Sequence, residues 1–303
     1  QFPRASDYIS EQIDMVKTLE EKGYAYRGVA GVYFDSAKFP EYGKLGNIDL
    51  AGLKAGARVS SSSDKRNPTD FLLWKFSRIS EHDQKPSDAR RGESDDGDVH
   101  ERTSTLAQGP RNDAGDVSGH VPLGWDSPWG KGFPGWHIEC SAMSRAILGD
   151  QIDVHTGGIE HIPIHHNNEI AQSESATGKK PFSRFWLHRA HLQIEGAKIA
   201  KSVGNTIHVS DIIERGFPPL AFRYLLLGAH YRTSASFSWD NLKAAQTSLY
   251  RLYNYYDTFR DHASSEGSGN AFSYKTRFHE RINDDLDTPG ALAVMWELVK
   301  DEH

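Results

Sequence analysis

The chain carries two lysines three residues apart whose side chains could bind phosphate. Lys198 and Lys201 are followed directly by Ser202. Residues 192–194 alternate like a strand and residues 195–196 supply a turn, which predicts a loop just past a hairpin. Both ammonium groups can converge there on one polyanion, and such donors stabilise the charge that develops on a triphosphate. The sequence therefore predicts a phosphate-handling loop, with a solvated basic loop as the alternative because short motifs recur by chance.

A cysteine, a histidine and a glutamate carry a second chemistry. Residues 138–148 read as a helix, which places Cys140 in the first turn, where the helix dipole favours a thiolate. His165 and Glu169 lie four apart on one face of a further helix. One thiolate, one imidazole and one carboxylate form three quarters of a tetrahedral zinc shell whose open position can accept a substrate sulfur. The alternatives are a buried structural cysteine or a nucleophile at Cys140, and a surface pair of His165 with Glu169.

A glycine pair lies between these two regions. Residues 151–155 read as a short strand running into Thr156-Gly157-Gly158. We expect a turn there, at which the missing side chains let a ligand approach the backbone.

The elements that must position these residues follow from hydrophobic spacing. Apolar residues at helical spacing predict a helix behind a cap at Ser6, ended near Gly23. Ser238 is expected to cap another helix, and Thr288-Pro289 to open a third. The apolar stripes are Ile9, Ile13, Val16 and Leu19 in the first helix, and Leu242, Ala245, Leu249, Leu252 and Tyr256 in the second.

In this order the segments resemble cysteinyl-tRNA synthetases, a family of class I aminoacyl-tRNA synthetases whose signature loop is usually Lys-Met-Ser-Lys-Ser. The likeness is carried by residues 135–143, 153–160, 165–173 and 198–205, and by 38–45, 125–130 and 284–289. The loop departs from the family pattern at Ile199 and Ala200, where methionine and serine are usual.

The resemblance implies a role for each matching residue. The family holds one zinc per chain with two cysteines, a histidine and a glutamate, of which Cys140, His165 and Glu169 match three. Trp136, His137 and His155 match positions that line the amino-acid pocket. Lys198, Lys201 and Ser202 match the catalytic loop, and Gly157, Gly158 and Lys201 match positions that bind ATP.

The same resemblance implies an activity and partners. The complete enzyme would activate L-cysteine with ATP and Mg²⁺ to cysteinyl-adenylate, then transfer the cysteinyl group to tRNA(Cys). Zinc would recognise the substrate thiolate, because sulfur is a far better zinc ligand than a hydroxyl. We expect a cytoplasmic monomer without a membrane partner.

The implied fold class is α/β, as the second half of a doubly wound class I nucleotide-binding fold. We expect a connective insertion over 1–80, the catalytic half over 123–215 and a truncated helical bundle over 216–303. Residues 81–120 contain no aromatic residue, so residues 81–122 are predicted to be a disordered insertion. No His-x-Gly-His occurs in the sequence. We therefore expect an internal fragment, inactive alone, that lacks the N-terminal half with His-Ile-Gly-His and the C-terminal end.

Composition bounds this interpretation. The 303 residues are 37% hydrophobic and 25% charged, with no apolar run long enough for a membrane span. One cysteine excludes an intramolecular disulfide framework. The net charge of -6 gives no general attraction for nucleic acid, so any tRNA contact must use local basic patches.

Three other functions remain open from the sequence. A related ligase that joins cysteine to an amino sugar would share the zinc pocket, although residues 238–303 look more like the tRNA enzyme. A zinc-dependent metallohydrolase could use His165, His166 and Glu169, but it leaves the lysine loop unexplained. An inactive remnant that only binds RNA is the third.

Overall fold

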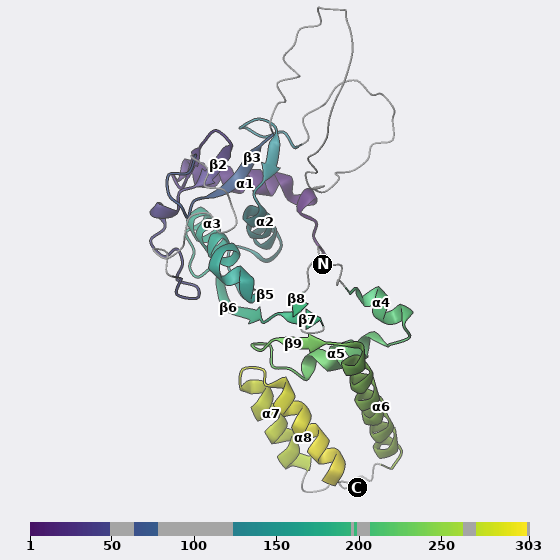
Figure 1. Ribbon diagram of the computed structural model, residues 1–303. Helices are drawn as coiled ribbons and strands as arrows, with labels where there is room; N and C mark the ends of the chain where they lie inside the picture. The colour runs from purple at the N-terminus through teal and green to yellow at the C-terminus, as the bar shows by residue number, and fades with distance from the viewer. Residues whose placement is uncertain (49–63, 78–123, 195–196, 199–206, 263–270, 302–303) are drawn as a thin grey trace, which may run out of the picture. The chain divides into compact units, whose positions relative to one another are not determined.

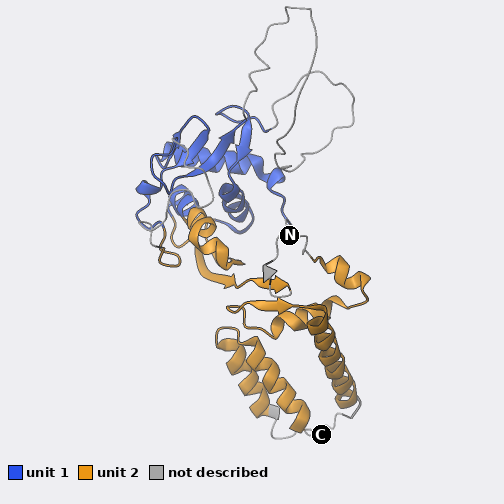
Figure 2. Cartoon of the chain, in the orientation of Figure 1, with its two compact units in different colours: residues 1–42, 50–149, 171–178 blue, residues 43–49, 150–170, 179–303 orange. Residues whose placement is uncertain are grey.

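The computed structural model describes residues 1–48, 64–77, 124–194, 197–198, 207–262 and 271–301. These residues form both helices and β-strands (Figure 1). They divide into two compact units, one of residues 1–42, 50–149 and 171–178, the other of 43–49, 150–170 and 179–303 (Figure 2). The insertion expected over residues 81–122 lies outside the described residues, as do Lys201 and Ser202. The expected domain boundaries stay a prediction.

The first unit is built on a four-stranded antiparallel sheet in the order β1-β2-β3-β4. Two helices, α1 and α2, pack on one another, and α2 also packs on β3. The bounds are α1 Ile9–Glu21, β1 Ala25–Arg27, β2 Gly31–Phe34, β3 Phe71–Phe76, β4 Gly132–Pro134 and α2 Trp136–Leu148.

The helix predicted near the N-terminus is confirmed as α1. Val16 and Leu19 from the predicted stripe are fully buried, and Gly23 ends the helix region in a left-handed conformation with φ of 77°. The cap predicted at Ser6 is wrong. A 3-10 turn over Ala5–Tyr8 precedes α1, and the hydroxyl of Ser6 donates to the side chain of Asp7 instead.

A buried carboxylate ties the loops of this unit to its sheet. Asp70 accepts hydrogen bonds from the Tyr26 hydroxyl at 2.7 Å, from the Ser36 backbone at 2.9 Å and hydroxyl at 2.7 Å, and from the Asn67 backbone at 2.9 Å. Burial raises the pKa of Asp70, but the hydrogen bonds from Ser36, Tyr26 and Asn67 outweigh it, so its pKa is lowered overall.

The second unit contains a parallel strand pair, β5 (Ile152–Gly158) and β6 (Ser183–Arg189). A helical crossover joins the two strands, as parallel pairing requires. It runs through a 3-10 turn (Ile159–His161) and a π-helical segment (Ile162–His166) into α3 (Asn167–Thr177). The helix α3 begins in the second unit and continues into the first. Gly178 follows α3 with φ of 75°.

The hairpin predicted before the lysine loop is confirmed. β7 (Leu192–Ile194) pairs antiparallel with β8 (Ala197–Lys198), and Ile194 is the partner of Ala197. On its other side β7 pairs parallel with β9 (Ala235–Phe237). The hairpin rests on an apolar core to which helices α4 (Val209–Glu214) and α5 (Pro219–Leu227) contribute. Its buried members are Ile194, Ile212, Ala221, Phe237 and Leu242.

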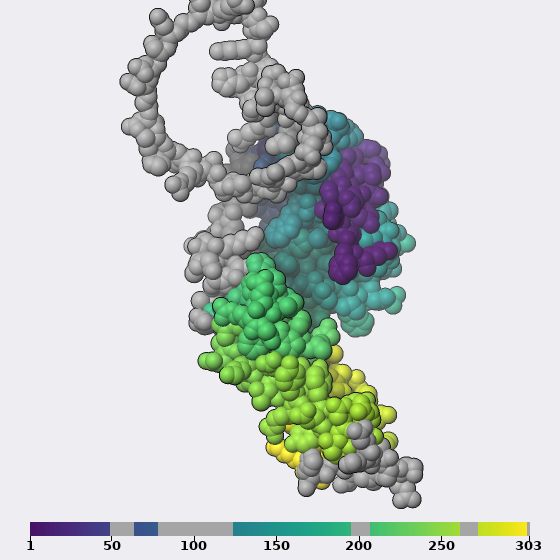
Figure 3. All heavy atoms as spheres, turned by 90° about the vertical axis from the view of Figure 1, so that its right-hand side faces the viewer, coloured from purple at the N-terminus to yellow at the C-terminus, as the bar shows by residue number. Residues whose placement is uncertain are grey.

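Three helices complete the second unit, namely α6 (Trp239–His262), α7 (Ala271–Asn283) and α8 (Thr288–Asp301). Green to yellow surface in Figure 3 belongs to the part of the chain from α4 onward. Ser238 caps α6 as predicted, because its hydroxyl accepts the backbone N–H of Asn241 at 3.1 Å. Leu242 and Ala245 of the predicted stripe are buried, but Tyr256 is 66% exposed and does not belong to it.

A carboxylate in the turn between α7 and α8 ties that turn to the segment before β9. Asp285 accepts hydrogen bonds from the Tyr231 hydroxyl and from the Arg232 guanidinium, each at 2.5 Å. These two partners hold the pKa of Asp285 at about 2, the guanidinium having the larger effect. Within the described residues no helix combines the length and apolar character that a membrane crossing requires.

Candidate metal and amino-acid site

The helix that carries Cys140 begins against the sheet of the first unit. Gly135 precedes α2, and its backbone N–H donates to the Leu73 carbonyl at 2.8 Å. A Cβ at Gly135 would lie 2.0 Å from the Leu72 carbonyl oxygen, so only glycine allows this close approach. Because α2 starts at Trp136, two residues earlier than predicted, Cys140 is its fifth residue. Cys140 therefore lies past the first turn, and the predicted help from the helix dipole is weaker.

A buried hydrogen bond joins α2 to α3 next to Cys140. The Gln172 amide donates to the Ser141 hydroxyl at 3.3 Å, and both side chains are fully buried. Gln172 lies one turn after Glu169 on α3, and both partners of this hydrogen bond belong to the first unit.

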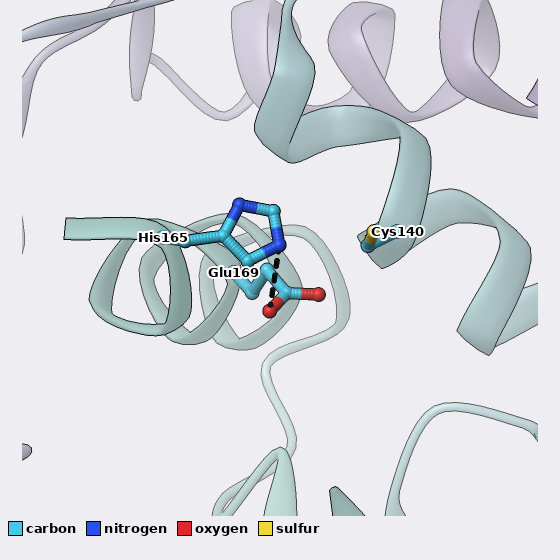
Figure 4. A group of neighbouring side chains, drawn as sticks. All are labelled: Cys140, His165 and Glu169. Carbon is cyan, nitrogen blue, oxygen red and sulfur yellow. Dashed lines mark ion pairs between the residues drawn. The ribbon is translucent and has the colours of Figure 1, made fainter. Parts of the chain in front are cut away.

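The three predicted zinc ligands come together. The Cys140 sulfur, a ring nitrogen of His165 and a carboxylate oxygen of Glu169 all lie within 4.8 Å of one another (Figure 4). His165 Nε2 is 3.4 Å from Glu169 Oε2. His165 belongs to the π-helical segment just before α3, and the four-residue spacing still places it on the same face as Glu169.

The burial of these groups suits a metal ion. Burial lowers the pKa of His165, although the Glu169 charge opposes this, and the neutral imidazole that results is the form that binds metals. Glu169 is completely buried, and its Oε1 atom has no hydrogen-bond partner among the described residues. A buried carboxylate oxygen without a partner is costly, and a cation beside it would remove that cost. The donor set therefore fits zinc.

Additional histidines surround the same carboxylate. His155 Nε2, from β5, lies 3.0 Å from Glu169 Oε2. His166 Nδ1 lies 2.7 Å from His188 Nε2, from β6. Burial is the main cause that lowers the pKa of His166 to about 2 and that lowers the pKa of His188, so both rings are neutral at physiological pH.

Trp186 completes this histidine cluster and was missed in the sequence. It is the register partner of His155 across the parallel strands, and the two rings meet edge to face with centroids 4.9 Å apart. On the same strand its ring is stacked with His188. The period of two between Trp186 and His188, matched by His155 and Gly157 on β5, is the signal that could have found them.

The turn predicted at Thr156-Gly157-Gly158 is wrong. These residues continue β5, and Gly157 pairs with His188. A Cβ on Gly157 would lie 2.6 Å from His166 Cε1, so here glycine makes room for a histidine ring. At Gly158 the nearest atoms are the carboxylate oxygens of Glu160, the end of a flexible side chain.

The other predicted pocket residues lie at the start of α2. Trp136 is 62% exposed, and its ring is 5.3 Å from that of His137. The His137 ring meets Phe71 edge to face at 5.7 Å, so it also packs against the sheet of the first unit. His155 contacts the metal-site carboxylate directly. The backbone of Lys198 belongs to β8, on the hairpin itself and not beyond it.

A family model described as the catalytic domain of class I (C) tRNA synthetases matches residues 1–92 and 115–247. The chain belongs to the class I tRNA synthetase family. Its α/β fold class is therefore that of a class I synthetase catalytic domain, as the sequence predicted.

Curated relatives carry the more specific name of cysteine–tRNA ligase. The chain is 41% identical over 298 residues to Cysteine–tRNA ligase 1 of Burkholderia lata, covering 98% of this chain and 54% of the relative. It is 38% identical to the cysteine–tRNA ligases of Treponema denticola and Chlorobaculum tepidum, covering 99% and 98% of this chain and 57% and 53% of those relatives. The chain thus spans about half the length of the curated relatives it matches. The amino sugar ligase and the metallohydrolase are not favoured.

A solved structure also matches part of the chain. It is a ternary complex of Agrobacterium radiobacter K84 LeuRS with tRNA and LeuAMS, at 16% sequence identity and a TM-score of 0.46. The match covers 56% of this chain and 27% of that one.

Proposed function

We propose that the protein containing this chain is a cysteine–tRNA ligase. It would use ATP to convert L-cysteine to cysteinyl-adenylate and would transfer the cysteinyl group to tRNA(Cys). The observation that supports this best is the cluster of Cys140, His165 and Glu169, with a buried Glu169 oxygen that lacks a hydrogen-bond partner among the described residues. Relatives of the same name over nearly the whole chain support the same substrate.

In this proposal Cys140, His165 and Glu169 hold zinc. When bound, zinc supplies a soft Lewis-acid position that prefers a thiolate to a hydroxyl. The His155 N–H can donate to Glu169 Oε2 at 3.0 Å, which orients the carboxylate. The neutral His165 ring offers a lone pair without first losing a proton, because burial lowers its pKa.

The remaining roles concern the amino acid and ATP. Trp136, His137 and His155 are proposed to line the amino-acid pocket, with the exposed indole of Trp136 as an apolar wall. Lys198, Lys201 and Ser202 are proposed to bind and steady the triphosphate. Gly157 and Gly158, at the carboxyl end of β5, are proposed to lie near the nucleotide, because ligands of parallel α/β sheets bind at that end.

Discrimination between cysteine and serine tests the proposal on this chain. With one equivalent of cobalt(II) in place of zinc, L-cysteine should change the thiolate-to-cobalt absorption and L-serine should not. Binding of both amino acids with similar affinity would contradict recognition through sulfur. A Leu148→Ala variant should respond to the two amino acids as the unchanged chain does, because this exposed side chain at the end of α2 lies two turns from Cys140.

A further inference from the structure

A second group of metal-ligand side chains lies beside the Cys140 cluster. His155, His166 and Glu169 each offer one ligand atom, and these atoms lie within 4.8 Å of one another. Glu169 Oε2 is 3.0 Å from His155 Nε2 and 3.7 Å from His166 Nε2. Two ligands about 2.0–2.1 Å from a tetrahedral ion lie roughly 3.4 Å apart. The two separations bracket that value. Without an ion the shorter one is a hydrogen bond, and an ion would take the place of the proton that His155 Nε2 shares with Glu169.

The group is held in place before any ion binds. His155 comes from β5, His166 from the π-helical segment and Glu169 from α3, all within the second unit. His166 is 1% exposed and Glu169 is not exposed at all. The ring of Trp186, from β6, packs against both imidazoles, with centroids 4.9 Å from His155 and 4.8 Å from His166. Rings packed in this way lose little freedom when they become ligands.

The hydrogen bond between His166 Nδ1 and His188 Nε2 is linked to the protonation of the other His166 nitrogen, Nε2. If His166 donates Nδ1–H to His188, its Nε2 lone pair faces the Glu169 carboxylate. Two buried acceptors facing one another are unfavourable, and a cation between them would remove that cost. In the opposite tautomer His166 Nε2–H faces Glu169, but 3.7 Å is too long for a hydrogen bond. The first arrangement is the usual one at metal sites, where a ligating histidine donates its other N–H to a neighbour.

The carboxylate has enough oxygens for two ions. Glu169 Oε2 is the atom near the imidazoles of His155, His165 and His166, whereas the buried Oε1 lacks a hydrogen-bond partner among the described residues. A carboxylate can bind one cation through each oxygen and so bridge two metal positions.

We propose that this chain binds a second divalent transition-metal ion through His155, His166 and Glu169. Glu169 bridges it to the ion at Cys140 and His165, so the inference rests on the zinc site of the proposed function. Imidazole donors suit ions such as Zn²⁺ and Ni²⁺, and this group contains no sulfur donor.

Cobalt(II) titration of the tag-free 303-residue chain separates the two positions, because the sequence has only one cysteine. After chelator dialysis we expect two bound equivalents, of which one shows thiolate-to-cobalt charge transfer and the other only ligand-field absorption. The His155→Gln variant should keep the charge-transfer equivalent and lose the other. His191→Gln is the matched control, because His191 lies 3.6 Å from Glu160 and outside the group, and it should keep both equivalents.

Each other result decides a specific point. A single equivalent in the unchanged chain, or two in His155→Gln, overturns the second site. A His155-dependent equivalent without any charge transfer contradicts the Cys140 site and leaves the histidine site standing. Loss of the near-ultraviolet circular dichroism of His155→Gln would mean that the variant does not fold. Cadmium-113 NMR of the unchanged chain is then the test in place of this variant. Two resonances, of which only one has a sulfur-shifted frequency, are then expected, and a single resonance overturns the inference.

Discussion

Gly157 and His166 are in such close contact that no side chain fits between them. A Cβ on Gly157 would lie 2.6 Å from His166 Cε1 and 2.7 Å from His161 Nδ1. Changing Gly157 to Ala should therefore lower the free energy of unfolding by about 1–3 kcal/mol, the usual cost of overpacking. Urea unfolding measures this. Gly158→Ala is the matched control with a smaller cost, since the Glu160 side chain can turn away; equal losses would contradict the contact.

The Ser238 cap gives a prediction on helix stability. Ser238→Ala should cost about 1 kcal/mol, because the Asn241 N–H at the start of α6 loses its acceptor. The same change at Ser248, inside α6, should be neutral or slightly stabilising, since alanine is the better helix former. Thermal unfolding of both variants checks this, and a larger loss for Ser248→Ala would refute the capping role.

Asp70 should make the chain sensitive to acid. Its pKa is lowered in the folded state, so its stabilising contribution is present above the unfolded pKa of about 3.9 and is lost as the pH falls through the folded pKa. Asp70→Asn should thus destabilise the chain at neutral pH and show a flatter stability profile below about pH 4. Urea unfolding as a function of pH measures both. Asp14→Asn, an exposed residue of α1, is the control; if it matches Asp70→Asn, the buried network does not cause the effect.

The lysine loop supplies a prediction on rate. In a protein that contains the whole catalytic domain, Lys201→Ala should slow cysteine-dependent pyrophosphate exchange by about a hundredfold, the scale of removing one transition-state charge donor. Cysteine affinity should stay nearly unchanged, since sulfur recognition is assigned to zinc. Lys179→Ala is the control. The Lys179 ammonium lies 2.9 Å from the Asp150 carboxylate, and Lys179 is not part of the hairpin. An unaffected Lys201 variant would show that the loop does not act on phosphates.

Local patterns in the sequence were enough for much of the framework. The stripe with Val16 and Leu19, the Ser238 cap and the hairpin at Ile194 depend on neighbours within a few residues, and each was confirmed. Ser6 failed as a cap because a 3-10 turn begins before it could act. The sequence did not show that the Ser6 hydroxyl would donate to the side chain of Asp7 instead.

The site shows the same division. Cys140, His165 and Glu169 could be named from the sequence because their chemistry points to one metal, whichever elements carry them. The structure brings their ligand atoms within 4.8 Å of one another, and their role as zinc ligands stays a proposal. Trp186 was missed, and the strand at Gly157 was misread as a turn, because both depend on the register between β5 and β6. That register joins residues about 30 apart in sequence, such as His155 and Trp186, and no local spacing reveals it.

The ligand set of the first bound zinc tests the Cys140 site most directly. With one equivalent of zinc on the 303-residue chain, X-ray absorption should show a single sulfur at about 2.3 Å together with nitrogen and oxygen neighbours. Because Cys140 is the only cysteine, Cys140→Ser should remove that sulfur while the protein stays folded. A zinc shell without sulfur in the unchanged chain, or one that keeps sulfur in Cys140→Ser, would contradict the account.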